Sequence, residues 1–169
     1  MEQATWLRYL KQSILVAAVF LLQFIFADKF RLFGVAPNFA FAFVLTVSFL
    51  KKQEFSFYSA LILGILTDSV SGRLFGTYTV LFMLVAYGIR EFYHSAFSEN
   101  FFIESMYGLL VCLLYSLGYA FFISLFRGEF LTLLSKTAWI EFLYNFVIFL
   151  IMLVIQKKHN KKHRSVFRL

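Results

Sequence analysis

The chain has 169 residues, of which 61% are hydrophobic and 15% are charged, and its mean hydropathy is +0.78. Soluble domains contain about 45–50% apolar and about 25% charged residues, so this composition excludes a soluble enzyme, a nucleic-acid-binding domain and a disordered regulator. The formal net charge is +7, and six of the sixteen Lys and Arg residues lie in the last thirteen positions.

Six apolar runs follow one another along the chain and predict an all-α membrane protein. They cover residues 6–27, 33–50, 55–67, 74–89, 105–126 and 137–155. About 20 apolar residues cross about 30 Å of hydrocarbon, and these runs are too continuous for the alternating strands of a membrane barrel. The expected fold is a six-transmembrane-helix bundle over residues 1–156, followed by a basic cytoplasmic tail over residues 157–169.

The third run leaves the number of spans open, because its thirteen residues are also short enough for a re-entrant segment. Lys and Arg are enriched on the cytoplasmic side of membrane proteins. Six spans place eleven of them inside and five outside, whereas merging the third and fourth runs puts the basic tail outside and reverses the bias. The count favours six spans with both termini in the cytoplasm, although without the tail each side carries five.

The basic tail is expected to lie at the membrane surface, where clustered positive charge attracts anionic lipid. Its six basic residues are Lys157, Lys158, Lys161, Lys162, Arg164 and Arg168. Their position at the end of an apolar run predicts contact with lipid headgroups and no contact with nucleic acid.

The single proline, Pro37, is expected in the first turn of the second span. A missing backbone donor costs nothing there, because the first N–H groups of a helix have no partner within it. Asn38 then lies slightly deeper in the membrane, where its amide must find a hydrogen-bonding partner.

A polar, glycine-rich segment lies between the third and fourth runs and contains Gly64, Asp68, Gly72 and Gly76. A carboxylate near the hydrocarbon boundary is costly unless it is paired, hydrated or bound to a helix end. Asp68 is expected to accept backbone N–H groups at the start of the next helix or to pair with Arg73. The functional alternative is a polar site that lines a cavity open to the outer face.

Small residues recur every four positions along the fifth run. They are Gly108, Cys112, Ser116, Ala120 and Ser124. This spacing predicts a helix stripe that another backbone can approach closely. The approaching helix is expected to belong to the same bundle, and the functional alternative is a transmembrane helix of a partner.

The chemistry-bearing residues form no catalytic or metal-binding set. Cys112 is the only cysteine, and the three histidines lack the carboxylate or thiolate companions of a metal site. Glu141 and Asn145 are four residues apart and share a helix face, with Tyr144 beside them. Glu141 lies close to the outer interface, so its solvation there is expected, and the alternative is a proton-coupled or substrate site. No enzyme activity, metal or cofactor is therefore expected.

Two local patterns resemble the MreD family of bacterial rod shape-determining membrane proteins. One is Gly34-Val-Ala-Pro37-Asn38 at the start of the second run, and the other is Gly64-x-x-x-Asp68 followed by Gly72 and Gly76. The resemblance implies a non-catalytic protein of the cell-wall elongation machinery in the bacterial cytoplasmic membrane. It further implies MreC, actin-like MreB, and a glycosyltransferase and transpeptidase as partners, and a fold similar to the substrate-binding membrane subunits of energy-coupling-factor vitamin transporters.

These observations favour a membrane scaffold that binds an MreC-like single-span partner and links it to peptidoglycan synthesis. The alternative is a substrate-binding membrane component of a vitamin-type transporter. A ligand site needs convergent polar groups within the bundle. Only Gln23, Ser116 and a few tyrosines are expected at that depth, which favours the scaffold.

Overall fold

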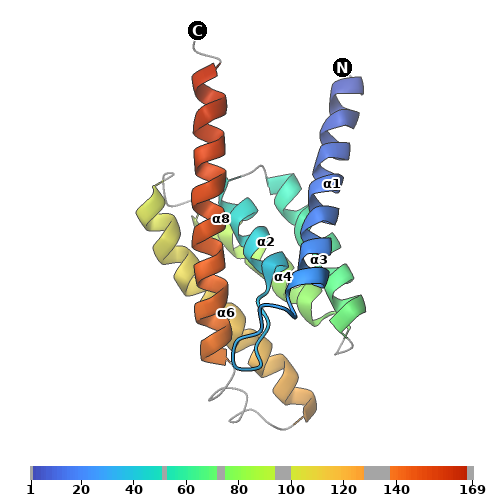
Figure 1. Cartoon of the computed structure of the whole chain (residues 1–169), viewed down its shortest axis with the longest axis vertical. Helices are drawn as coiled ribbons and strands as arrows, with labels where there is room; N and C mark the ends of the chain where they lie inside the picture. The colour runs from blue at the N-terminus through green and yellow to red at the C-terminus, as the bar shows by residue number, and fades with distance from the viewer. Residues whose placement is uncertain (1, 51–52, 72–74, 94–99, 128–137, 167–169) are drawn as a thin grey trace.

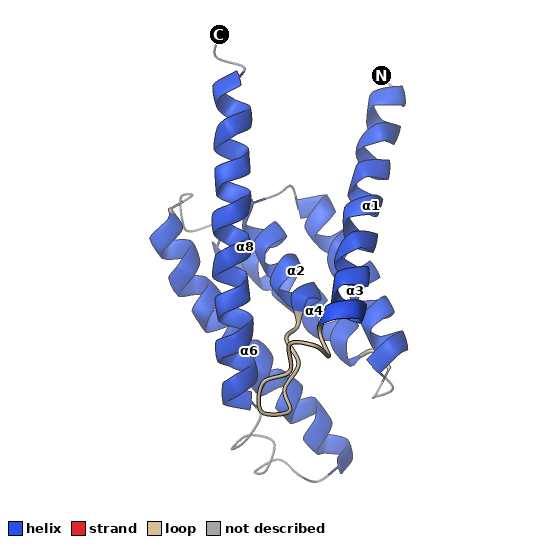
Figure 2. Cartoon of the chain, viewed as in Figure 1, coloured by secondary structure: helices blue, strands red, loops and turns tan. Residues whose placement is uncertain are grey.

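Helices make up nearly all of the part of the chain that the structure describes. The structure is a computed structural model that describes residues 2–50, 53–71, 75–93, 100–127 and 138–166. Its elements are α1 (Glu2–Phe26), α2 (Phe39–Leu50), α3 (Gln53–Ser71), α4 (Thr77–Gly88), the short π-helical turn η1 (Ile89–Tyr93), α6 (Phe101–Arg127) and α8 (Ala138–Val166) (Figure 1). No strand occurs in these ranges (Figure 2), which confirms the all-helical class.

Helix α2 forms the centre of the bundle. Every residue from Ala40 to Phe49 is buried, and α2 contacts α1, α3, α4 and α8. A helix that is apolar on all sides is stable only when other helices surround it. Its 12 residues measure about 18 Å, so α2 is shorter than the roughly 30 Å of a hydrocarbon core.

Three helices in the described ranges are long and apolar enough to cross a membrane by themselves. Their apolar stretches are Tyr9–Phe26 in α1, Phe101–Leu125 in α6 and Ala138–Lys158 in α8. The six-span arrangement also needs α2, α3 and α4 with η1, and it stays a prediction. Both chain termini lie at the same end of the bundle (Figure 1), and we call the opposite end the far end.

Two helix boundaries differ from those expected. The second run was expected to be helical from about residue 33, but α2 begins at Phe39, because Leu32 and Val35 exchange two backbone hydrogen bonds of 3.0 and 2.9 Å in a tight turn. Phe33 and Gly34 within this turn have positive φ angles, which no helix accommodates. The third run is longer than its thirteen apolar residues, because polar residues at both ends extend α3 to 19 residues.

Two further expectations near the helix ends are corrected. Pro37 precedes the N-cap residue Asn38 and does not lie in the first turn of α2. The basic tail continues α8 as helix as far as Val166, so the backbone does not change character at Lys157. Lys161, Lys162 and Arg164 lie on this extension, whereas Arg168 lies outside the described residues.

The small-residue stripe of α6 faces the inside of the bundle. Gly108, Cys112, Ser116 and Ala120 are all buried, and a Cβ atom at Gly108 would overlap the ring of Phe149 in α8. Ser124 ends the stripe and donates its hydroxyl to the carbonyl of Phe121 (2.7 Å). The stripe therefore brings α6 against its own neighbours, in agreement with the packing interpretation and not with a docking face for a partner.

The backbones of α3 and α4 approach each other closely at Gly64. A Cβ atom at Gly64 would lie 2.5 Å from the Cα atom of Thr79. Because the obstacle is backbone, a side chain at this position requires the two helices to move apart.

We expect Gly64→Ala to lower the melting midpoint of the purified protein in detergent, since overpacking costs about 1–3 kcal/mol in packed cores. The matched control is Gly88→Ala, because a Cβ atom at Gly88 meets nothing within 4 Å and alanine stabilises a helix by up to about 1 kcal/mol relative to glycine. A thiol-reactive dye follows unfolding through the single, buried Cys112. Equal midpoints for the two variants would contradict the close approach.

Candidate functional site

The N-terminus of α2 is held by side chains from two other helices. The first four N–H groups of any helix have no acceptor within it. Here the N–H of Asn38 donates to Asn145 Oδ1 (3.0 Å), and the next two donate to Gln23 Oε1 (2.7 and 3.4 Å). The fourth, that of Phe41, donates to Asn38 Oδ1 (2.9 Å). All four groups are thus satisfied by amide side chains of α1, α8 and the N-cap residue.

This helix start lies inside the apolar part of the bundle. Asn145 is seven residues from Ala138, the end of the apolar stretch of α8, which corresponds to roughly 10 Å along the helix axis. Asn38 is buried beside it and donates its amide to the hydroxyl of Tyr115 (2.8 Å). Irregular backbone at such depth is tolerated only where protein buries it or where it lines a water-filled cavity.

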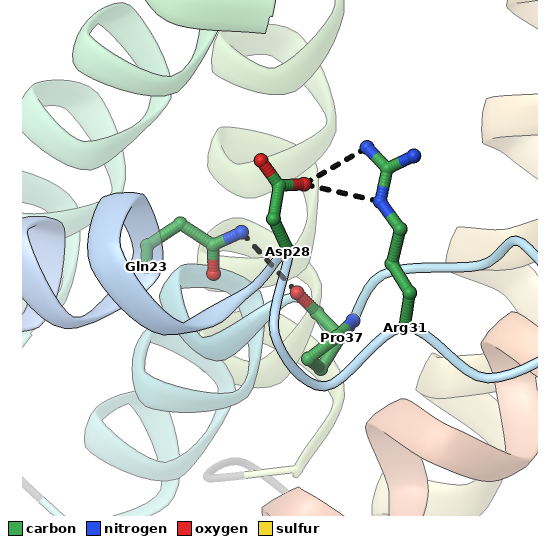
Figure 3. Close-up of polar contacts among 4 residues, drawn as sticks. All are labelled: Gln23, Asp28, Arg31 and Pro37. Carbon is green, nitrogen blue, oxygen red and sulfur yellow. Dashed lines mark hydrogen bonds and ion pairs between the residues drawn. The ribbon is translucent and has the colours of Figure 1, made fainter.

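The segment between α1 and α2 folds over this site. Arg31 donates from Nε and Nη2 to Asp28 Oδ1, at 3.0 and 2.9 Å. Gln23 uses the other end of its amide to donate to the carbonyl of Pro37 (3.2 Å) (Figure 3). On the opposite side, the hydroxyl of Tyr144 donates to the carbonyl of Phe30 (2.6 Å). One glutamine therefore fixes both the start of α2 and the segment that leads into it.

Asp68 holds the start of α4 in a similar way. Its Oδ1 accepts the N–H of Tyr78 (3.0 Å), and its Oδ2 accepts the N–H and the hydroxyl of Thr79 (2.9 and 2.6 Å). A carboxylate at a helix N-terminus is favoured by the helix dipole. The capping expected of Asp68 is thus present. Gly72 and Arg73 lie outside the described residues, so the expected pairing of Asp68 with Arg73 stays a prediction.

Gly76 is the N-cap residue of α4, with a φ of 97°. Glycine adopts this left-handed conformation without the steric cost that other residues incur. The conformation turns the chain into α4 so that its first free N–H groups face Asp68.

A polar cleft opens at the far end, next to the starts of α2 and α4. It consists of two adjoining cavities of about 210 and 340 Å³. Both cavities are lined by Gln23, Arg31, Ala36, Thr67 and Tyr78. Glu141 lines the smaller cavity and Asp28 the larger one. The cavity considered above as the functional alternative for the glycine-rich segment therefore has a physical counterpart, lined by residues of α1, α3, α4 and α8.

The opposite end of the bundle contains an ion pair that the hydropathy pattern does not predict. Lys157 Nζ lies 2.5 Å from Glu104 Oε2, and the Glu104 side chain is completely buried. The ammonium group also lies 5.6 Å from the ring centroid of Phe101. Lys157 was expected to contact lipid headgroups. It points into the bundle instead, because a buried carboxylate is costly without a counter-ion. Lys158, the next residue, is exposed.

The structure brings some of the predicted residues together and separates others. Pro37 and Asn38 lie at the cleft, close to Asp68 and Gly76 at the adjoining start of α4. The α6 stripe lies elsewhere, between α6 and its neighbours. The fifth predicted run begins at residue 105, directly after Glu104, and Lys157 belongs to the predicted tail, so the hydropathy pattern does not predict a contact between them. The one available signal is that Glu104 directly precedes the longest uninterrupted apolar run.

The helices and their internal polar contacts define an all-helical membrane protein. In the described ranges, no group of three or more His, Cys, Asp or Glu side chains is placed to bind a metal. The family model described as rod shape-determining protein MreD matches residues 3–161, and the chain belongs to the MreD family. Comparisons with curated proteins and with solved structures found no match. The chain is accordingly a bacterial membrane protein with a role in rod shape determination.

We expect Asp68→Leu to lower the melting midpoint, because it leaves the part-buried N–H groups of Tyr78 and Thr79 without an acceptor, at up to about 1–3 kcal/mol for each. Asp68→Asn should have an intermediate effect, since one of the two accepting oxygens is replaced by a donor that faces Thr79 or Tyr78. Glu54→Gln removes an exposed carboxylate from the same helix and serves as the control. A melting midpoint of Asp68→Leu equal to that of Glu54→Gln would show that the capping bonds contribute nothing.

Proposed function

We propose that the chain is a non-catalytic, six-span scaffold of the cell-wall elongation complex in the bacterial cytoplasmic membrane. In this proposal both termini lie in the cytoplasm, and the protein binds an MreC-like membrane partner and links it to peptidoglycan synthesis. The observation that carries the proposal is the family match over residues 3–161. The actin-like MreB and the wall-building glycosyltransferase and transpeptidase are further partners that the family resemblance implies.

The position of the chain termini supports the proposed topology. Both chain termini lie at the same end of the bundle (Figure 1), as an even number of membrane crossings requires. The extension of α8 beyond Lys157 carries basic residues, which favour the cytoplasmic side. The proposal also includes a fold similar to that of the substrate-binding membrane subunits of energy-coupling-factor vitamin transporters.

Helix α1 is the face that we propose for the partner. Only 6% of its apolar stretch is buried inside the chain, compared with 44% for the stretch of α6. Its few contacts with the bundle lie on one side and include buried Val16 and a 2.9 Å hydrogen bond between Ser13 and Tyr58. The rest of α1 offers a continuous apolar surface to another transmembrane helix, a role that the inward-facing stripe of α6 cannot fill.

The alternative is a substrate-binding component of a small-molecule transporter. The polar cleft is the observation in its favour, because such a component needs a ligand site. Helix α2, whose residues from Ala40 to Phe49 are all buried, fills the centre of the bundle. A scaffold can also carry a small ligand site, so the cleft alone does not favour transport.

The topology predicts that fluorescent-protein fusions at both ends of the chain fold and fluoresce, since these reporters mature in the cytoplasm. An alkaline-phosphatase fusion at the C-terminus should be inactive, because this enzyme requires export. Phosphatase activity of the C-terminal fusion at normal protein level would exclude the six-span topology.

The partner surface can be tested with bulky substitutions on exposed positions of two helices. We expect the double variant Leu10→Trp, Ile14→Trp in α1 to reduce co-purification of an MreC-like protein from native membranes. The matched control in α6 is Leu110→Trp, Leu114→Trp, whose positions are similarly exposed. Both variants should melt like the unmodified protein. Loss of the partner from the α6 variant alone would move the interface to α6, and retention by both would exclude α1 as the docking face.

A further inference from the structure

The polar cleft at the far end has the features of a ligand site. We propose that it binds a small zwitterionic molecule, of the size of an amino acid or a dipeptide, with its carboxylate at Arg31 and its ammonium group at Glu141. This inference is independent of the partner-binding proposal, and under the proposed topology the cleft faces the outside of the cell.

Thr67 provides the observation that points to a ligand. Thr67 is only 9% exposed and lines both cavities, and its hydroxyl has no hydrogen-bonding partner in the described part of the chain. Hydroxyls in helices commonly donate to the carbonyl four residues earlier, as those of Thr46 and Ser69 do in this structure. The unused hydroxyl of Thr67 is therefore available to a molecule in the cleft, and buried polar groups without a partner require such an explanation.

The charged side chains indicate the chemistry of the ligand. Arg31 lines both cavities, and its ion pair with Asp28 is largely exposed, so it is easily rearranged. The guanidinium has five N–H donors, of which Asp28 uses two, and a ligand carboxylate can take others in a bidentate contact. Glu141 lines the same cavity as Arg31 and supplies the opposite charge. One cation and one anion in the smaller cavity match a molecule with both charges.

The helix end at the floor of the cleft does not compete for the carboxylate. All four N–H groups at the start of α2 already donate to side chains, so recognition of an anion falls to Arg31. The volumes of about 210 and 340 Å³ lie below or at the lower limit of drug-sized pockets, which are about 300–1,000 Å³. The ligand is therefore small.

The test is calorimetric titration of the full chain in lipid nanodiscs with alanine and alanyl-alanine. N-acetylalanine lacks the ammonium group and alaninamide lacks the carboxylate, so we expect each to bind at least tenfold more weakly than the better of the two zwitterions. Saturable binding of a zwitterion with this discrimination supports the proposal. No saturable binding of either zwitterion, or equal binding of the analogues, overturns it.

Variants connect the binding to the cleft. Thr67→Val keeps the shape of the side chain and should weaken zwitterion binding about tenfold with an unchanged melting midpoint, because the hydroxyl has no partner to lose. Thr46→Val removes a hydroxyl that is bonded away from the cleft and should bind normally. The exposed Arg31→Gln variant should lose the preference for the zwitterion over alaninamide. Unchanged binding by both Thr67→Val and Arg31→Gln overturns the assignment to the cleft. Co-purification of the membrane partner with these two variants should be unaffected, because neither residue lies on the proposed partner surface.

Discussion

The structure depends on the satisfaction of the backbone N–H groups at the start of α2. Each unsatisfied backbone group in hydrocarbon costs several kcal/mol, and α2 begins roughly 10 Å inside the apolar stretch of α8. Gln23 and Asn145 reach this point from α1 and α8, and Asn38 completes the set. These three amides allow a helix of 12 residues to begin within the bundle and to form its centre.

The same arrangement produces the cleft. Because α2 does not reach the far end, the segment from residue 27 to residue 38 folds back between α1 and α8, and polar side chains line the space beneath it. Asp68 places the start of α4 beside this space by accepting the N–H groups of Tyr78 and Thr79. The caps and the cleft are therefore one polar layer, in which the residues that hold the helices also shape the surface open to water.

Hydropathy predicted the helices and one cap, and it missed the contacts between distant segments. The apolar runs locate all the long helices. Asp68 precedes Tyr78 by only ten residues, and this short separation was enough to indicate that Asp68 caps the next helix. The contact between Asn38 and Asn145 spans 107 residues, and no periodicity in one sequence encodes it. The start of α2 was missed because Phe33 to Ala36 are apolar by composition, whereas the turn at Phe33 and Gly34 is set by backbone conformation.

The two ends of the bundle differ in how they hold the helices. At the end with the termini, Phe49 packs edge-on against Tyr93 and Tyr107, and the ion pair of Glu104 with Lys157 joins α6 to α8. At the far end, the helices are held together by hydrogen bonds between side chains and the N–H groups of helix termini. Apolar packing holds the end with the termini, whereas the helix starts at the far end are capped beside a polar cavity. Of the three long apolar helices, α1 is the least covered by its own chain. Leu10 and Ile14 on its exposed surface are not among the residues that line the cleft, so the proposed partner surface extends beyond the proposed ligand site.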